Sequence, residues 1–209
     1  MPFNIAIIDY EMGNLKSIYK CLKHLNVDTI ITDDSKVILD TDGVILPGVG
    51  AFGDAMRHLK EKNLIPVITQ IVNEKKPLFG ICLGQQLIFS KSYEMGEHEG
   101  LNLIKGDIIP FDISKVDKIP QIGWNSVEFL TKENFLIQGI PNNSYFYFVH
   151  SFYADPENKD LIIGLTKYGE VEYCSIIGRD NIIATQFHPE KSSKYGIQIY
   201  KNFIKYCRK

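Results

Sequence analysis

Apolar and polar residues follow two different patterns along the chain. Short, continuous apolar runs such as FNIAIID (residues 3–9) are typical of strands that are covered on both faces of a sheet. Between these runs, apolar residues recur at helical spacing, most clearly in NLKSIYKCLKHLN (14–26). The pattern predicts strands over 3–9, 27–32, 42–48 and 76–82, and helices over 14–26, 51–63 and 65–75.

After about residue 100, strand-like runs separated by turn residues replace this alternation. GRDN (178–181) is the clearest hairpin turn, and an amphipathic helix over 194–207 closes the chain. The runs cover 126–130, 144–154, 161–169, 172–180 and 181–190. Because alternating strands and helices form βαβ units, we expect an α/β fold with a central, mostly parallel sheet flanked by helices and a strand-rich C-terminal half.

The composition is that of a globular protein. With 44 % hydrophobic and 23 % charged residues, the 209-residue chain can bury a sizeable core, and we expect a single domain over residues 1–209. The net charge is −2 and no basic block stands out, so no nucleic-acid partner is expected. No apolar run approaches the roughly 18 residues that span a bilayer, so no membrane association is expected.

The four cysteines are scattered along the chain without any CxxC pair. This spacing indicates neither a disulfide framework nor a zinc site, so we expect no metal and no cofactor. Free thiols fit a reducing, cytoplasmic location. The cysteines are Cys21, Cys82, Cys174 and Cys207.

The stretch PLFGICLGQQLIF (77–89) places Cys82 between two glycines, where a predicted strand gives way to a helix-like run. In the pattern glycine–x–nucleophile–x–glycine, a sharp turn lifts the nucleophile above the carboxyl edge of the sheet, and the glycines avoid clashes that a Cβ would make. The helix N-terminus favours the reactive thiolate, and the N–H of Leu83 points to where an oxyanion would form. A lone cysteine is more often a buried core residue, but this context favours a nucleophile.

A cysteine nucleophile usually needs a base, and His188 is the strongest candidate. His188 ends the apolar run NIIATQF and precedes Pro189, which cannot continue the hydrogen bonding of a strand. Because residues i and i+2 of an extended chain point the same way, Glu190 can reach the imidazole, hold its tautomer and stabilise the imidazolium. The sequence therefore predicts a Cys82–His188–Glu190 triad.

The other histidines have plainer interpretations. His24, His58 and His98 lie among charged residues and are expected at the surface. His150 lies among aromatic residues in FVHSF and fits a hydrogen-bonded core histidine.

The glycine-rich segment GVGAFG (48–53) leaves two interpretations open. It follows a predicted strand and opens a helix, as the dinucleotide fingerprint of nicotinamide- or flavin-dependent oxidoreductases does. Against that interpretation, Pro47 interrupts the junction, and the next predicted strand ends in Cys82 and not near an acidic residue. We favour a loop whose free N–H groups, from Val49 or Gly50, complete an oxyanion hole with Leu83.

Several motifs together resemble the triad-type, class I glutamine amidotransferases. PLFGICLGQQLIF and ATQFHPEKS carry the resemblance to the class, and IIDYEMGNLKSI, LPGVGAFGDAM, IPQIGWN and YFVHSF are similar to the glutaminase subunits of imidazole glycerol phosphate synthases. The motifs run from Ile7 to Ser192 and so cover nearly the whole chain.

This resemblance implies a glutaminase that uses the triad to hydrolyse L-glutamine. It implies that Gln86 and the backbone of Gly50, Ser151 and Phe152 bind the amino-acid end of glutamine. It also implies a heterodimer with a (β/α)₈-barrel cyclase subunit, which receives the ammonia and makes imidazole glycerol phosphate in histidine biosynthesis. The positions that match the family's partner interface are Asn14, Trp124, Tyr147 and Lys191.

Three residues depart from what is usual in the resembled family. Glu11 stands where glycine is more common, Gln121 where histidine is frequent, and Phe152 where tyrosine is usual. None belongs to the predicted triad. The departures leave open a paralogous glutaminase that supplies ammonia for another acceptor, such as a sugar.

Overall fold

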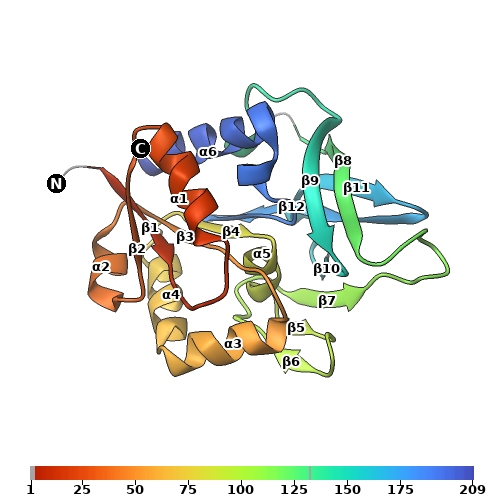
Figure 1. The fold of residues 1–209 in the computed structure, drawn as a ribbon, viewed down its shortest axis with the longest axis horizontal. Helices are drawn as coiled ribbons and strands as arrows, with labels where there is room; N and C mark the ends of the chain where they lie inside the picture. Colours follow the sequence, from red (N-terminus) through yellow and green to blue (C-terminus); the bar gives the residue numbers. More distant parts are fainter. Residues whose placement is uncertain (1–2, 132) are drawn as a thin grey trace.

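The computed structural model describes residues 3–131 and 133–209 and contains a mixed sheet with helices on both faces (Figure 1). Its first half has the predicted alternation of strands and helices. The strands are β1 (Asn4–Ile8), β2 (Asp28–Thr32), β3 (Gly43–Leu46) and β4 (Leu78–Ile81). The helices are α1 (Leu15–His24), α2 (Ser35–Asp40), α3 (Phe52–Glu61), α4 (Leu64–Asn73) and α5 (Leu83–Leu87).

The predicted parallel sheet is confirmed. Strand β1 pairs in parallel with β2 and β3, and β3 pairs in parallel with β4. On its other side β4 pairs in parallel with β13 (Ile182–Thr185), which comes from the C-terminal half. The carboxyl ends of β4 and β13 therefore lie side by side, with Ile81 opposite Thr185. This pairing brings Cys82, just after β4, close to the segment that follows β13.

The C-terminal half contains more strands than the pattern predicts. Strands β5 and β6 have two residues each, which is too short for any periodicity to mark them. The remaining strands are β5 (Lys91–Ser92), β6 (His98–Glu99), β7 (Gly106–Pro110), β8 (Gln121–Phe129), β9 (Ser144–His150), β10 (Phe152–Pro156), β11 (Ile162–Tyr168) and β12 (Val171–Arg179). Helical elements here are η1 (Phe135–Ile137), η2 (Lys159–Leu161), η3 (Pro189–Lys191) and α6 (Ser193–Cys207).

Two predicted strand runs have different boundaries in the structure. The run 144–154 is two strands, because the chain stops pairing with β8 after His150 and starts pairing with β7 at Phe152. The run 181–190 leaves the sheet after Thr185 and forms the 3₁₀ helix η3, in which Pro189 has no N–H to offer a ladder. The hairpin at GRDN is confirmed, since Arg179 pairs with Ile182 across the turn.

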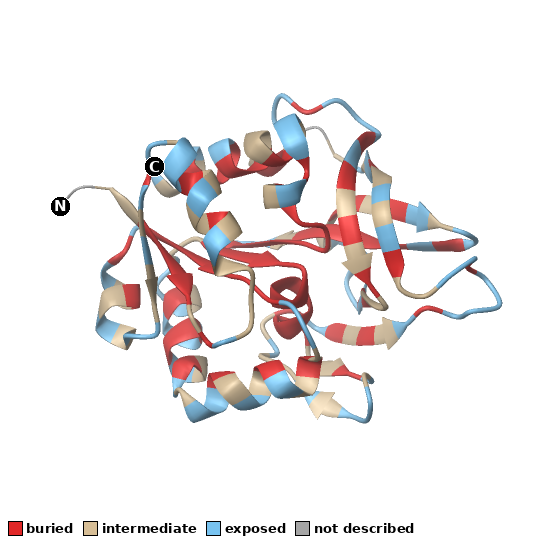
Figure 2. Ribbon diagram, viewed as in Figure 1, coloured by how far each residue is buried: buried red, intermediate tan, exposed pale blue. Residues whose placement is uncertain are grey.

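The core lies on both faces of the parallel strands, as the continuous apolar runs predict (Figure 2). Along β1, Ile5 and Ile7 pack on one face in the cluster that includes residues of α1 and α6. Ala6 and Ile8 pack on the other face with residues of α3 and α4. Within residues 3–131 and 133–209, no helix is both long enough and apolar enough to cross a membrane.

The junction between β4 and α5 packs tightly against the end of β3. A Cβ built on Gly84 would lie 1.9 Å from the carbonyl oxygen of Leu46, and one on Gly80 would lie 2.8 Å from the carbonyl oxygen of Gly84. Both obstacles are backbone atoms, which cannot rotate away as a side chain can. The two glycines that flank Cys82 are therefore required by packing.

We predict that Gly84→Ala lowers the free energy of unfolding by about 3 kcal/mol, the upper part of the range for overpacked sites, because β3 must move to admit the methyl group. Equilibrium urea unfolding measures the change. Gly13→Ala is the matched control, since its Cβ would meet only side-chain atoms of Leu15 and Pro47, at 3.0 Å or more. Equal stability of Gly84→Ala and the wild type would contradict this account of the junction.

Candidate active site

Cys82 occupies a strained turn at the carboxyl edge of the sheet. Its φ of 54° and ψ of −109° lie outside the regions that residues with a Cβ normally adopt. The turn is held by its backbone: Cys82 N–H donates to Thr185 O at 2.8 Å, and the N–H of Gln85 donates to Cys82 O at 2.9 Å. The thiol is 6 % exposed and faces a cavity. This is the geometry that the glycine–x–cysteine–x–glycine pattern predicts.

The loop after β3 packs against this turn and lines the same cavity. Tyr10 Oη donates to Pro47 O at 2.6 Å and anchors the base of the loop. Gly50 has a φ of +100°, and Val49 is 40 % exposed. Across the described ranges, the N–H groups of Val49, Gly50 and Leu83 donate to no oxygen of the protein. The residues that carry these unpaired N–H groups line the cavity together.

His188 and Glu190 form a buried hydrogen-bonded pair. Nδ1 of His188 lies 2.8 Å from Oε1 of Glu190, and the two side chains are 2 % and 1 % exposed. The pairing is as predicted, but the reason given for it is wrong, because Pro189–Lys191 is a 3₁₀ turn and not an extended strand. Since a carboxylate accepts, Nδ1 carries the hydrogen.

The charge on His188 is set by its neighbours. Burial lowers the pKa of His188, but its interactions with Cys82 and with the carboxylate of Glu190 together outweigh burial and raise that pKa to about 10. The imidazole is therefore protonated at neutral pH. Its Nε2 has no hydrogen-bond partner in the described part of the chain. The arrangement places a protonated imidazole and a thiol at the same cavity.

Two glutamine side chains connect α5 to neighbouring parts of the chain. Gln86 Nε2 donates to Phe152 O and to Gln186 Oε1, each at 3.0 Å. Gln186 Nε2 in turn lies 3.8 Å from Cys82 Sγ. Sequence reasoning missed Gln186, although its position two residues before His188 is a signal that could have indicated it.

The cavity has a volume of about 370 Å³, which is within the range of small-molecule sites. Every predicted catalytic, oxyanion and substrate residue lines it except Glu190, which lies behind His188. Glu94 also lines it and was missed, because an acidic residue in a polar loop carries no signal of its own. Its carboxylate accepts the N–H of Phe52 at 2.6 Å and so is held at the cavity wall.

Comparison with known proteins identifies the family. The model of the family described as glutamine amidotransferase class-I matches residues 6–206. The chain belongs to the class-I glutamine amidotransferases.

Within the class-I glutamine amidotransferases, the similar curated proteins are of one kind. The chain is 47 % identical over 205 residues to imidazole glycerol phosphate synthase subunit HisH of Sulfurimonas denitrificans, with 97 % of this chain and 98 % of the relative covered. It is 49 % identical over 200 residues to HisH of Methanocaldococcus jannaschii, with 96 % and 98 % covered. At this identity and coverage the chain belongs to the HisH subunits.

Solved structures share the class-I amidotransferase fold. The Thermotoga maritima PurLQS structure aligns with a TM-score of 0.76 at 17 % identity, covering 99 % of both chains. The glutaminase domain of Trypanosoma brucei CTPS aligns with a TM-score of 0.67 at 15 % identity, covering 97 % of this chain and 94 % of that one. The predicted fold class is confirmed.

Family membership does not favour the dinucleotide interpretation of GVGAFG.

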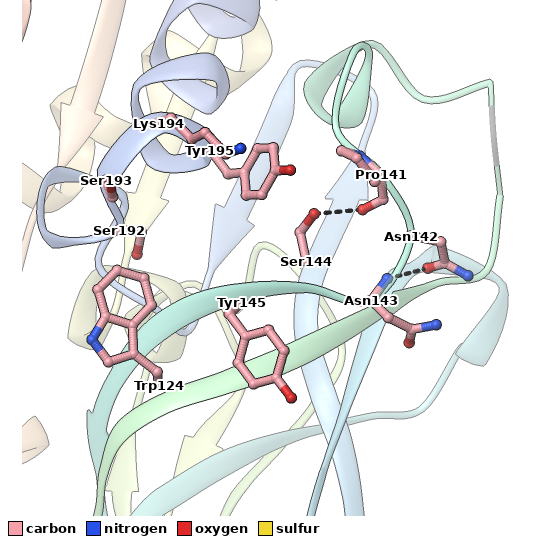
Figure 3. Close-up of a pocket in the computed structure, with 10 residues that line it drawn as sticks. All are labelled: Trp124, Pro141, Asn142, Asn143, Ser144, Tyr145, Ser192, Ser193, Lys194 and Tyr195. Carbon is pink, nitrogen blue, oxygen red and sulfur yellow. Dashed lines mark hydrogen bonds between the residues drawn. The ribbon is translucent and has the colours of Figure 1, made fainter.

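The four positions expected at the partner interface lie outside the cavity. Trp124 is 52 % exposed, so it is not core filling, and its ring centroid lies 6.2 Å from that of Tyr147. Nζ of Lys191 lies 5.7 Å from the Tyr147 ring, so Trp124, Tyr147 and Lys191 form a row. Asn14 precedes α1, which contacts η3. Figure 3 shows the surface hollow beside Trp124, formed by residues 141–145 and 192–195.

The histidines outside the triad are only partly as predicted. His24 is exposed, and His150 is the expected hydrogen-bonded core histidine at 6 % exposure, although it also lines the cavity. His58 and His98 are half-buried. His58 lies 3.5 Å from a carboxylate oxygen of Glu11.

Two of the three departures from the family pattern have structural explanations. Glu11 has a φ of 70°, the region that favours glycine, and its carboxylate lies 3.1 Å from Nζ of Lys62. Gln121 is 3 % exposed and hydrogen-bonded to Tyr173 at 2.9 Å. Nothing in the structure explains Phe152. Among residues 3–131 and 133–209, no group of three or more His, Cys, Asp or Glu is arranged to hold a metal ion.

We predict that Glu190→Gln folds but loses between about 10² and 10⁴ of its glutaminase turnover. The amide keeps the shape but no longer stabilises the imidazolium; the matching change in serine proteases costs about 10⁴, and general acid–base steps contribute about 10²–10⁴. Steady-state ammonia release measures the loss, with the exposed Glu170→Gln as control. Turnover within a factor of about 2 of the wild type would place the orienting group elsewhere.

The same substitution also has a pH signature. The folded-state pKa of His188 is raised, so the stability that Glu190 gives to the imidazolium is complete below the ordinary value of 6.5 and is lost as pH rises through about 10. We therefore predict that the difference in unfolding free energy between the wild type and Glu190→Gln shrinks over this window. Urea unfolding at a series of pH values tests it, and a difference that grows with pH would contradict it.

Proposed function

We propose that this chain hydrolyses L-glutamine and passes the ammonia to a cyclase subunit that makes imidazole glycerol phosphate in histidine biosynthesis. The observation that carries the proposal is Cys82 together with the protonated His188 at the wall of one cavity, in a chain that belongs to the HisH subunits. The family model spans residues 6–206 in one stretch, and we treat the chain as one glutaminase domain.

The reaction begins with attack of the Cys82 thiolate on the side-chain amide carbon of glutamine. The oxyanion that forms is bound by the N–H of Leu83 and an N–H of the Val49–Gly50 segment. His188 gives its Nε2 proton to the amide nitrogen, the carbon–nitrogen bond breaks, and ammonia leaves a thioester on Cys82. Water then attacks the thioester, His188 takes a proton from it, and glutamate and the thiolate are regenerated.

The other groups of the cavity wall hold the amino-acid end of glutamine. Gln86 and the backbone of Gly50, Ser151 and Phe152 provide polar atoms at the cavity wall. The carboxylate of Glu94 has the charge that complements the α-ammonium group of the substrate. Since that carboxylate is held by Phe52, it is positioned before glutamine binds.

A chain that releases ammonia needs a partner that uses it, because ammonia in water at neutral pH is mostly ammonium and is not nucleophilic. We place a (β/α)₈-barrel cyclase subunit against the row formed by Trp124, Tyr147 and Lys191, with Asn14 beside it. An exposed tryptophan and tyrosine are the residue types that dominate binding energy at interfaces. The free thiols of the described residues fit a cytoplasmic location.

We predict that the chain alone hydrolyses glutamine slowly and that the cyclase subunit with its acceptor bound raises kcat by about 10²–10³. One donor of an oxyanion hole contributes a factor of this size, and the peptide at Gly50, whose φ is +100°, can turn at little steric cost. Glutaminase kinetics with and without the partner, together with an assay of the imidazole product, test both halves of the proposal.

Trp124→Ala is the matched variant, since it removes an interface residue outside the cavity. We expect it to weaken the activation by the partner and to leave the slow rate of the free chain unchanged. Full activity of the free chain, unaltered by the complex, would contradict the gating. Ammonia transfer to a different acceptor, with no imidazole product, would contradict the assignment to histidine biosynthesis.

A further inference from the structure

Three buried polar side chains form a continuous chain of hydrogen bonds that ends at the cavity wall. The side-chain amide of Gln121 lies 2.9 Å from Tyr173 Oη, which lies 3.2 Å from Nε2 of His150. Nδ1 of His150 lies 2.8 Å from the carbonyl oxygen of Phe152. The three side chains are 3 %, 2 % and 6 % exposed, and none belongs to the triad. Such a buried network costs free energy unless each member is satisfied.

The carbonyl at the end of the chain fixes the direction of every proton in it. A carbonyl oxygen only accepts, so Nδ1 of His150 carries the hydrogen. Burial lowers the pKa of His150 to about 4, so the ring is neutral at pH 7 and its Nε2 has a lone pair. The atom of Gln121 that lies 2.9 Å from Tyr173 Oη is Oε1. Because the single proton of Tyr173 goes to Nε2 of His150, the Gln121 amide must be turned over so that its N–H faces Tyr173.

The carbonyl of Phe152 also sets the orientation of the side-chain amide of Gln86. The atom of Gln86 that faces Phe152 O must be the amide nitrogen, and this nitrogen also donates to Gln186 Oε1, each at 3.0 Å. Both hydrogens of the amide are then used. The oxygen of Gln86 is left as the polar atom that can face the cavity, which Gln86 lines.

We propose that Gln121, Tyr173 and His150 are positioning residues that hold the Phe152 carbonyl, and through it the Gln86 amide, in the orientation that binds glutamine. The inference rests on the proposed function, since it concerns the same cavity. An acceptor oxygen on Gln86 binds the α-ammonium group of an amino acid. An inverted amide would turn its N–H groups toward that cation and repel it. The chain of hydrogen bonds thus acts on substrate binding and leaves the triad untouched.

Tyr173→Phe removes one hydroxyl from the chain and keeps the ring. In the complex with the cyclase subunit, we expect the KM for glutamine to rise about tenfold, as for one lost hydrogen bond, while kcat stays within a factor of about 2. The control is Tyr153→Phe, whose ring centroid lies 5.5 Å from that of Tyr173 and whose hydroxyl has no hydrogen bond within the described ranges. We expect wild-type KM and kcat from the control.

A second measurement needs no substitution. Nitrogen-15 NMR of the wild-type chain reports which nitrogen of His150 carries the hydrogen, and we expect the Nδ1–H form at pH 7. Tyr173→Phe keeps the carbonyl that accepts from Nδ1, so we expect the same tautomer in that variant. If that variant does not fold, the wild-type tautomer decides the question alone.

An Nε2–H or doubly protonated His150 in the wild type at pH 7 would overturn the proposal. So would a KM of Tyr173→Phe within a factor of about 2 of the wild type, or a loss in kcat of that variant as large as its rise in KM. The same KM change in Tyr153→Phe would also overturn it. Absence of glutaminase turnover in the wild-type complex would instead overturn the proposed function. The tautomer measurement would still test the chain of hydrogen bonds in that case.

Discussion

The active site depends on one close contact, between the backbone of the β4–α5 turn and the carbonyl of Leu46 at the end of β3. Only a glycine fits at position 84, because a Cβ there would lie 1.9 Å from that carbonyl oxygen. The contact forces Cys82 into a backbone conformation with a φ of 54°, which raises its thiol above the edge of the sheet. The free N–H of Leu83 and the cavity both follow from this turn.

The parallel pairing of β4 with β13 completes the site. Ile81 and Thr185 are opposite each other in the register, so the two strands end at the same edge. Pro189 then ends the strand-like path, and the 3₁₀ turn that follows brings Glu190 back to His188. Burial alone would lower the pKa of His188; its interactions with Cys82 and with the carboxylate of Glu190 reverse that tendency. Strand register and electrostatics therefore act together to make a reactive pair.

Sequence reasoning was most successful where a physical requirement leaves a pattern in neighbouring residues. The buried strands and the glycines around Cys82 have such local signals, whereas the His188–Glu190 pair was predicted from an extended chain that the structure does not have. It failed where the determining contact is distant in sequence. Glu94 reaches the cavity through its bond to Phe52, and Gln121 belongs to a chain that spans three strands. The split of the run at Ser151 also depends on a change of pairing partner, which no local periodicity records.

The most direct test of the central claim is covalent labelling by an electrophilic analogue of glutamine, followed by peptide mapping. Burial, with a contribution from nearby Glu190, raises the pKa of Cys21 to about 11, and burial raises that of Cys207 to about 12 and that of Cys174 further still, so these thiols stay protonated at neutral pH. The account predicts that Cys82 alone is labelled, and that excess L-glutamine protects it. Labelling at another cysteine, with Cys82 left unmodified, would contradict it.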